Sequence, residues 1–430
     1  MDLVLLGKML FYICMVPLIV YSLKFYALSI SSFFCRGRKW DGKDIPDDEL
    51  PNITVQIPVY NDPVVVECVK SCLKFDYPKG KCEVIVVDDS TDETVKLLDK
   101  LKKEVGGFRI IRRKSRAGFK AGALNEATKI SKGDVIVIFD SDYVLKEDFL
   151  RKAVQPFSED ERIAFVQTRW DYLNPGKNRI SRLAMTCYNA FHQCSMPVKE
   201  RIGTAIFCGT GGAIKKNVLL ASGGWNEENI GEDIDLTVRI LDMGYKQAYL
   251  PYVKARGEVP ETIKSFVKQQ QRWAYGTTKV MRDYTRRLMG SKGLSKRQKF
   301  DLLFIVTGFM VFPFILGVTL STFITMAPWF GPNTTGEIFN AAYLVRSLGI
   351  VLSEVFSWQG IALLTLSCGY IFQCLVGLVM EKKYKEIAIL PAIFFMGFII
   401  QITNTISVFK ALLGVKHTFY KTPKSMYRGV

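Results

Sequence analysis

Long apolar segments lie at both ends of this chain, and they constrain its fold more than any other feature. The first runs from Leu3 to Phe34, and later ones run from Leu302 to Phe330, from Gly360 to Met380 and from Ile387 to Val415. Each is long enough to cross the ~30 Å hydrocarbon core of a bilayer as a helix. The sequence between them is of mixed polarity. The whole chain therefore predicts an integral, multi-pass membrane protein, most simply of the cell membrane, with a soluble domain between its membrane segments.

Basic residues set the expected orientation. Residues 36–39 are rich in Arg and Lys and follow the first apolar segment, which is too long for a cleaved signal peptide. Because such cations stay on the cytosolic side, we expect the soluble domain in the cytosol. Residues 338–358 are expected to lie on the membrane as an interfacial helix. The basic tail at 416–430 conflicts with three later crossings, so either it breaks the charge rule or the last segment crosses only in part.

The net charge of +17 indicates an anionic partner. Much of this charge lies in residues 286–300, directly before an apolar segment, where lipid head groups are the simplest partner. No stacking-aromatic or helix-turn-helix pattern accompanies it, so nucleic acid is not expected. The sequence names no protein partner.

Metal-binding motifs of cysteine and histidine are not expected. The chain has 10 cysteines and 2 histidines. Cys68 and Cys72 have helical spacing, but no second pair completes a zinc site. Reduced core cysteines and structural histidines, His192 and His417, are the simpler interpretation.

Strand and helix patterns alternate through the soluble domain, residues 50–285. The expected strands are 53–58, 84–87, 110–112 and 135–139, and the expected helices are 63–75, 93–103 and 117–130. This alternation predicts an α/β, Rossmann-like domain with a mostly parallel sheet covered by helices. In such sheets, ligands bind at the carboxyl ends of the strands. The whole chain then divides into a membrane helix (1–35), the soluble domain, the basic interfacial segment (286–300), transmembrane and interfacial helices (301–415) and the tail (416–430).

Two apolar strands end in acidic residues. One ends in Asp88 and Asp89, and the other ends in Asp140, Ser141 and Asp142. A single acidic pair could be a turn or a helix cap. Two pairs at one sheet edge are better explained by a hard cation held by carboxylate oxygens, with phosphates completing its shell. Asp140 and Asp142 are therefore the candidate ligands of Mn²⁺ or Mg²⁺, which would act as a Lewis acid on a diphosphate leaving group.

Two further motifs follow along the chain. Glu232, Asp233 and Asp235 lie at the start of a predicted helix at 236–243, where they could complement the helix dipole or include a general base. Gln269, Arg272 and Trp273 precede the second apolar segment. Arg272 and Trp273 could belong to the membrane interface, or Arg272 could neutralise a diphosphate while Trp273 contacts an acceptor sugar.

Together these motifs resemble the D, DxD, xED, QxxRW set of family 2 glycosyltransferases of the cellulose synthase and hyaluronan synthase type. The resemblance covers residues 50–290, and it is closest to the glucomannan mannosyltransferase branch in stretches such as Val55–Asn61, Lys120–Leu124 and Val166–Trp170. It implies a GT-A fold. It also implies Asp233 as the base, donor contacts from Tyr60, Asp62, Asp88, Asp89, Lys120, Asp140, Gln269 and Arg272, acceptor contacts from Glu232 and Trp273, and metal ligands Asp140 and Asp142. Asp62 stands where the family commonly has Glu.

A base opposite a metal-bound leaving group favours in-line displacement, so an α-linked donor should give a β-linked product. The resemblance implies a hexosyltransferase, with mannose from GDP-mannose as the first expectation. Because few membrane segments are available to enclose a polymer, the expected acceptor is a sugar hydroxyl of a lipid-linked oligosaccharide. The alternative is a processive mannan or glucan synthase using GDP-mannose or UDP-glucose. Weaker alternatives are a polyprenyl-phosphate sugar transferase and a non-catalytic scaffold.

Overall fold

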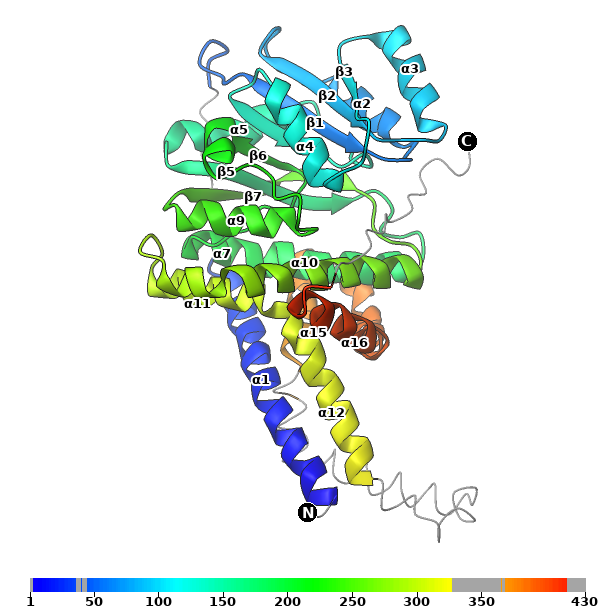
Figure 1. Cartoon of the computed structure of the whole chain (residues 1–430), viewed down its shortest axis with the longest axis vertical. Helices are drawn as coiled ribbons and strands as arrows, with labels where there is room; N and C mark the ends of the chain where they lie inside the picture. Colours follow the sequence, from blue (N-terminus) through cyan, green and yellow to red (C-terminus); the bar gives the residue numbers. More distant parts are fainter. Residues whose placement is uncertain (1–2, 36–39, 41–44, 327–364, 366–367, 416–430) are drawn as a thin grey trace.

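The computed structural model describes residues 3–35, 40, 45–326, 365 and 368–415. An α/β head sits on long helices that lie across its base, and a narrow helical stem extends away from them (Figure 1). The predicted interfacial helix at 338–358 and the basic tail at 416–430 lie outside the described residues.

A seven-stranded mixed sheet forms the centre of the head, in the order β3-β2-β1-β4-β6-β5-β7. β1 pairs in parallel with β2 and β4, β2 with β3, and β5 with β7, whereas β6 is antiparallel to both of its neighbours. The predicted mostly parallel sheet is thereby confirmed. The strands are β1 (Ile53–Val59), β2 (Cys82–Asp88), β3 (Arg109–Arg112), β4 (Val135–Ile138), β5 (Ile163–Tyr172), β6 (Gly212–Lys215) and β7 (Lys246–Gly257).

Helices cover both faces of this sheet because alternate strand residues point to opposite sides. Val55 and Ile57 of β1 belong to one buried cluster with α2, α3 and α5. Ile136 and Ile138 of β4 belong to another, with α4, α8 and α9. The helices of the head are α2 (Val65–Cys72), α3 (Thr94–Val105), α4 (Phe119–Ile130), α5 (Phe149–Glu159), α6 (Arg179–Ala190), the π-helix η1 (Phe191–Ser195), α7 (Met196–Ile202), α8 (Lys216–Ala221) and α9 (Glu232–Asp242).

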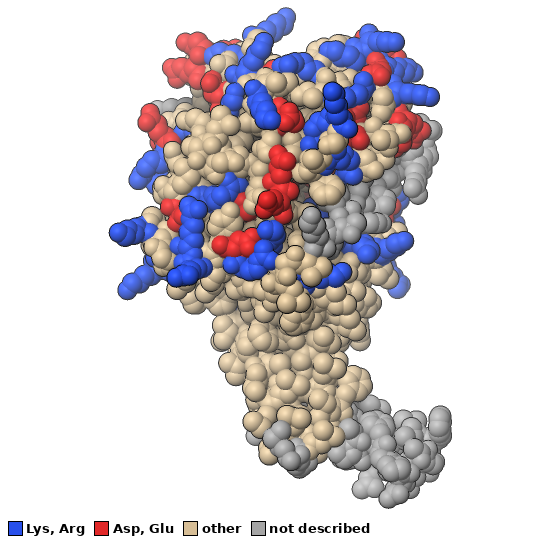
Figure 2. All heavy atoms as spheres, in the orientation of Figure 1, with Lys and Arg blue, Asp and Glu red and all other residues tan. Residues whose placement is uncertain are grey.

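The remaining helices form the base of the head and the stem. They are α1 (Leu3–Ser32), α10 (Ile263–Gly290), α11 (Lys296–Val306), η2 (Gly308–Met310), α12 (Val311–Met326), α15 (Gly369–Met380), η4 (Tyr384–Ile389) and α16 (Leu390–Leu412). α10 and α11 lie across the base of the head, whereas α1 and α12 form the stem (Figure 1). Figure 2 shows charged side chains over the head down to this level, and the stem is free of them on the face in view.

The described helices include three candidate membrane spans, judged by length and composition: Leu3–Ser32, Gly308–Thr325 and Tyr384–Leu412. α1 and α12 run antiparallel: Gly7 near the start of α1 lies against Thr325 near the end of α12, and further along α1 the Tyr21 hydroxyl donates to the carbonyl of Thr307, just before α12, at 2.8 Å. The second span begins later than the sequence suggested, since α11 ends at Val306 before a short 3₁₀ turn. Of the expected segment 360–380, residues 360–364, 366 and 367 lie outside the described residues, and the described part contains the 12-residue α15.

Candidate active site

The predicted acidic residues meet at the carboxyl edge of the parallel strands. Asp88 is the last residue of β2, and Asp140 follows β4 by two positions. Tyr60 and Asp62 follow β1, which lies between those two strands. Parallel pairing of β1 with both neighbours brings all three strand ends to one side, as expected for a ligand site in an α/β sheet.

The Asp140–Asp142 segment is held by hydrogen bonds on both sides. Asp142 is 4% exposed, and its Oδ2 accepts the backbone N–H of Glu258 at 2.8 Å. The hydroxyl of Ser141 donates to Asp62 at 2.5 Å. The Asp140 side chain is 38% exposed. These bonds hold the segment in place. The Asp140 side chain is partly exposed to solvent, whereas Asp142 is buried.

Lys120 lies beside these acids. It is in the first turn of α4, and its Nζ lies 2.5 Å from Asp140 Oδ1 and 4.0 Å from Glu232 Oε1. It also donates to the Gly209 carbonyl at 2.9 Å. Burial lowers the pKa of the Lys120 ammonium, but Asp140 and Glu232 raise it by more, so the net pKa is raised and the cation is stabilised.

The start of α9 carries the candidate base. The structure begins this helix at Glu232, so the acidic residues form its first turn rather than precede it. Asp233 Oδ1 accepts the backbone N–H of its neighbour Ile234 at 2.9 Å. Burial raises the pKa of Asp233, against lowering by that hydrogen bond and by Lys120 and Arg272. Asp233 is therefore a better proton acceptor than an ordinary aspartate.

Glu232 and Asp235, the acidic neighbours of Asp233, lie in different surroundings. Burial and the charge of Asp233 raise the pKa of Glu232 to about 7, although Lys120 opposes this. Asp235 is 1% exposed, pairs with Arg239 at 2.7 Å and accepts a hydrogen bond from the side-chain amide of Asn226 at 2.8 Å. Both oxygens of the Asp235 carboxylate are therefore engaged in structural contacts.

α10 places the Gln269–Trp273 motif next to the start of α9. The charge of Arg272 lowers the pKa values of both Glu232 and Asp233, which puts Arg272 within electrostatic reach of both carboxyls. The ring of Trp273 lies 5.4 Å from that of Tyr188 on α6. The Tyr188 hydroxyl donates to the side-chain carbonyl of Gln269.

Asp88 and Tyr60 lie on the other side of the site. Asp88 is 2% exposed and accepts from the Ser90 N–H at 3.0 Å and from Arg112 Nε at 3.1 Å. The Arg116 guanidinium stacks over the Tyr60 ring, 3.4 Å from its centroid. Nucleobases stack on aromatic side chains in the same face-to-face way as this guanidinium does.

Asp89 is paired with an arginine of the following loop. Its side chain is 5% exposed and forms a bidentate pair with Arg113, with Nε 2.9 Å from Oδ1. Arg113 in turn donates to the carbonyls of Ala117 at 2.8 Å and Phe119 at 2.9 Å. The visible contacts of Asp89 thus anchor the 113–119 loop that carries Arg116, and a direct bond from Asp89 to the donor stays a prediction.

Sequence reasoning missed three side chains of this site. Arg113 and Arg116 gave a weak signal, as two cations between a strand end and a helix start. Tyr188 gave none, because only the fold brings α6 against α10.

The two candidate metal ligands suit a site completed by substrate. Among the residues that the structure describes, no group of three or more His, Cys, Asp or Glu could hold a metal ion by itself. Asp140 and Asp142 supply two carboxylates, and Mg²⁺ is commonly held by one or two carboxylates together with substrate phosphates. The donor set therefore fits a divalent metal bound with a diphosphate.

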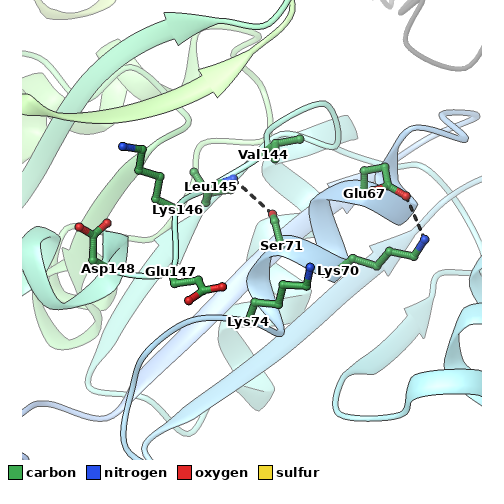
Figure 3. A pocket seen from close by; sticks show the side chains of 9 residues that line it. All are labelled: Glu67, Lys70, Ser71, Lys74, Val144, Leu145, Lys146, Glu147 and Asp148. Carbon is green, nitrogen blue, oxygen red and sulfur yellow. Dashed lines mark hydrogen bonds and ion pairs between the residues drawn. The ribbon is translucent and has the colours of Figure 1, made fainter.

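A hollow of ≈ 620 Å³ lies elsewhere on the head, between α2 and the 144–148 loop (Figure 3). Its lining mixes Lys and acidic side chains and includes none of the predicted site residues. Leu145 N donates to the Ser71 hydroxyl at its floor, at 3.3 Å. We assign it no part in the chemistry of the sheet edge.

The mixed sheet and its acidic carboxyl edge define a glycosyltransferase domain of the GT-A type. The chain belongs to the family described as "Glycosyltransferase like family 2", whose model matches residues 51–276. The predicted family is confirmed.

Two curated relatives from plants are named as mannosyltransferases. The chain is 31% identical over 286 residues to glucomannan 4-beta-mannosyltransferase 7 of Arabidopsis thaliana, covering 62% of this chain and 50% of that protein. It is 30% identical over 319 residues to probable glucomannan 4-beta-mannosyltransferase 7 of Oryza sativa subsp. japonica, covering 70% and 54%. The chain thus spans about half the length of the curated relatives it matches.

A solved structure shares the fold. It is a mannosyltransferase from Pyrobaculum calidifontis in complex with GDP-mannose and Mn²⁺, with a TM-score of 0.54 and 20% identity. The match covers 84% of this chain and 99% of that one. It supports the GT-A fold.

Proposed function

We propose that this protein is a membrane-bound, metal-dependent inverting mannosyltransferase. It transfers mannose from GDP-mannose to a sugar hydroxyl of a growing β-linked polysaccharide. The observation that carries the proposal is the meeting of Asp140, Lys120 and Asp233 at one sheet edge, in a chain whose relatives are named as mannosyltransferases. The lipid-linked acceptor expected from the sequence has no counterpart among these relatives, and their glucomannan names favour the polysaccharide alternative.

On the donor side, Asp88 and Tyr60 hold the nucleoside, and Lys120 turns from Asp140 to the diphosphate. Asp140 and Asp142 would hold Mn²⁺ or Mg²⁺, which supplies Lewis-acid neutralisation of the leaving diphosphate. Arg272 lies close enough to the acidic cluster to stabilise the same developing charge.

On the acceptor side, Trp273 contacts the acceptor sugar and Asp233 takes the proton from its attacking hydroxyl. Gly209 packs against Asp233, since a Cβ on Gly209 would lie 3.2 Å from Asp233 Oδ2. As Asp233 takes the proton, the acceptor hydroxyl oxygen attacks the anomeric carbon from the side opposite the diphosphate. The bond to the nucleoside diphosphate breaks and it leaves in line, so an α-linked donor gives a β-linked product.

The same proposal includes the membrane arrangement. The domain at 50–285 lies in the cytosol, α10 and the basic 286–300 segment lie along the head-group region, and α1 and α12 cross the bilayer. The level at which charged side chains give way to the uncharged stem supports this placement (Figure 2).

A donor screen tests the proposal. The full chain in detergent with Mn²⁺ would be supplied with GDP-mannose, UDP-glucose or UDP-N-acetylglucosamine, and nucleoside diphosphate release would be followed. We expect release from GDP-mannose and a polymer that β-1,4-mannanase digests. Release only from a UDP-sugar would overturn the donor assignment. Radiolabelled product that extracts into organic solvent would restore the lipid-linked acceptor.

A further inference from the structure

Glu381 lies directly after the membrane-side helix α15, yet its carboxylate is enclosed by the head. Its side chain is 9% exposed. Arg169 of β5 forms an ion pair with it, Gln193 donates to Oε1 at 2.6 Å, and Asn189 donates to Oε2 at 3.2 Å. Lys383 lies 2.7 Å from Oε2. One carboxylate therefore joins a catalytic-domain strand, the α6–η1 segment and the end of α15.

Three of these partners are direct neighbours in sequence of aromatic residues. Arg169 precedes Trp170, Asn189 follows Tyr188, and Gln193 follows His192. The aromatic wall, defined as Trp170, Tyr188, His192 and Trp273, is connected by ring contacts of 6.4 Å (Trp170–Tyr188), 5.1 Å (Trp170–His192) and 5.4 Å (Tyr188–Trp273). Glu381 thus binds the residue beside every member of the wall except Trp273.

Local backbone irregularities make this arrangement possible. The register of β5 against β7 shifts between Thr168 and Arg169, and such bulges re-aim side chains near active sites. The residues from Phe191 to Ser195 form a π-helix, another irregularity that is frequent at functional sites. α15 approaches this segment closely, since a Cβ on Gly377 would lie 3.1 Å from the Ala190 Cα.

The wall also connects to the reacting groups. The Trp170 indole N–H donates to the Thr210 carbonyl at 3.3 Å, and the Thr210 hydroxyl accepts the Asp140 N–H at 2.9 Å. At its other end, the Tyr188 hydroxyl donates to Gln269. The wall is thus bonded directly to the Gln269–Trp273 motif, whereas it reaches Asp140 only through Thr210.

We propose that Glu381 is a positioning residue for the acceptor subsite. By binding the neighbours of Trp170, Tyr188 and His192, it fixes the aromatic wall against Trp273 and makes acceptor affinity depend on the docking of α15. The inference rests on the proposed function, because it takes Trp273 as the acceptor contact. A rigid aromatic face that stacks on a sugar ring loses affinity when its support loosens.

The test uses the full chain in lipid nanodiscs. The variants are Glu381→Gln and Asn189→Ala, with Lys383→Met as the matched control. Lys383 touches the same carboxylate, but its neighbours in sequence are not aromatic members of the wall. The second variant leaves the Arg169–Glu381 pair in place, so it tests the proposal even if Glu381→Gln fails to fold through an unpaired buried Arg. The dissociation constants of GDP with Mn²⁺ and of β-1,4-mannohexaose are measured by calorimetry.

We expect Glu381→Gln and Asn189→Ala to weaken mannohexaose binding on the order of tenfold, the effect of one lost hydrogen bond to a charged group. GDP affinity should stay within about twofold, and Lys383→Met should match the wild type in both. Equal mannohexaose affinity in folded variants, or equal losses for both ligands, would overturn the inference. So would a wild type that binds GDP but no mannohexaose. A wild type that binds mannohexaose but no GDP instead contradicts the proposed donor.

Discussion

Gly231 and Gly276 lie backbone against backbone, where the turn before α9 crosses α10. A Cβ on Gly276 would stand 2.8 Å from the Gly231 Cα, and a Cβ on Gly231 would stand 3.0 Å from the Gly276 Cα. Real Cβ atoms do not approach backbone so closely without movement of one segment. This contact sets the distance between the candidate base Asp233 and the Gln269–Trp273 motif, because each lies within a few residues of one of the glycines.

Gly276→Ala should therefore separate α10 from α9. We expect transfer to fall roughly 10–100-fold, the scale of an ~1 Å misplacement of reacting groups. Gly290→Ala at the end of the same helix is the control, because a Cβ there meets nothing within 4 Å. Sugar transfer and melting temperature would be compared for the two variants. Equal activity of both would show that the contact does not set the site.

Asp233→Asn tests the base. Asn caps helices about as well as Asp, so a residue that only supports the start of α9 should tolerate the change. If Asp233 accepts the acceptor proton, transfer should fall by about 10²–10⁴-fold while donor binding and melting temperature change little. Asp235→Asn should behave in the opposite way, losing stability through its Arg239 pair. Near-normal transfer by a folded Asp233→Asn protein would shift attention to Glu232.

The pH dependence of transfer should follow the raised pKa of Asp233. A base works only when deprotonated, so activity should fall on the acid side. Because burial raises the pKa of Asp233, that limb should lie above the ordinary aspartate value of ~3.9. The pH profile of kcat/KM measures it. An acid limb at or below that value would contradict the assignment.

Glu232 should make stability depend on pH. Its pKa is raised from 4.5 to about 7 in the folded state, first by burial. The folded state then holds the Glu232 proton more tightly than the unfolded state does. The resulting contribution to the free energy of unfolding is fully present below pH 4.5 and is lost as the pH rises to about 7. Between acid and alkaline pH the wild type should lose up to about 3 kcal/mol of folding stability through this group, and Glu232→Gln should not show that loss. Melting temperatures at pH 5 and pH 8 should therefore differ less in the variant than in the wild type, and parallel curves would refute this.

Removal of divalent metal should abolish turnover, and Mn²⁺ or Mg²⁺ should restore it. Asp142→Asn keeps an oxygen for the Glu258 N–H but loses the charge that favours a cation. We expect kcat/KM to fall on the order of 10²-fold or more, as several kcal/mol of charge stabilisation disappear. The measurement is a metal titration of GDP release for both proteins. Full activity in excess chelator would remove the metal from the mechanism.

Much of this protein was predictable from local sequence. Apolar length predicted α1, and alternating patterns predicted the parallel core strands, because burial imposes a period on each element. Acids at two strand ends predicted a shared edge, since parallel strands end on the same side. The predicted start of α9 and the predicted start of the second membrane segment, at 302, were each wrong by a few residues. Helix ends depend on capping and on helix interruptions, and hydrophobicity does not report either.

Only the tertiary structure decided which side chains serve which others. Asp88 and Asp89 are adjacent and chemically identical, yet Asp88 pairs with Arg112 of β3, and Asp89 pairs with Arg113, which holds the 113–119 loop. Tyr188, Gly276 and Glu381 carried no local signal, because their partners lie on elements distant in sequence. A sequence pattern reports the burial of each element. The contacts between elements depend on how they pack, and at Gly231 and Gly276 that packing is decided by the absence of a side chain.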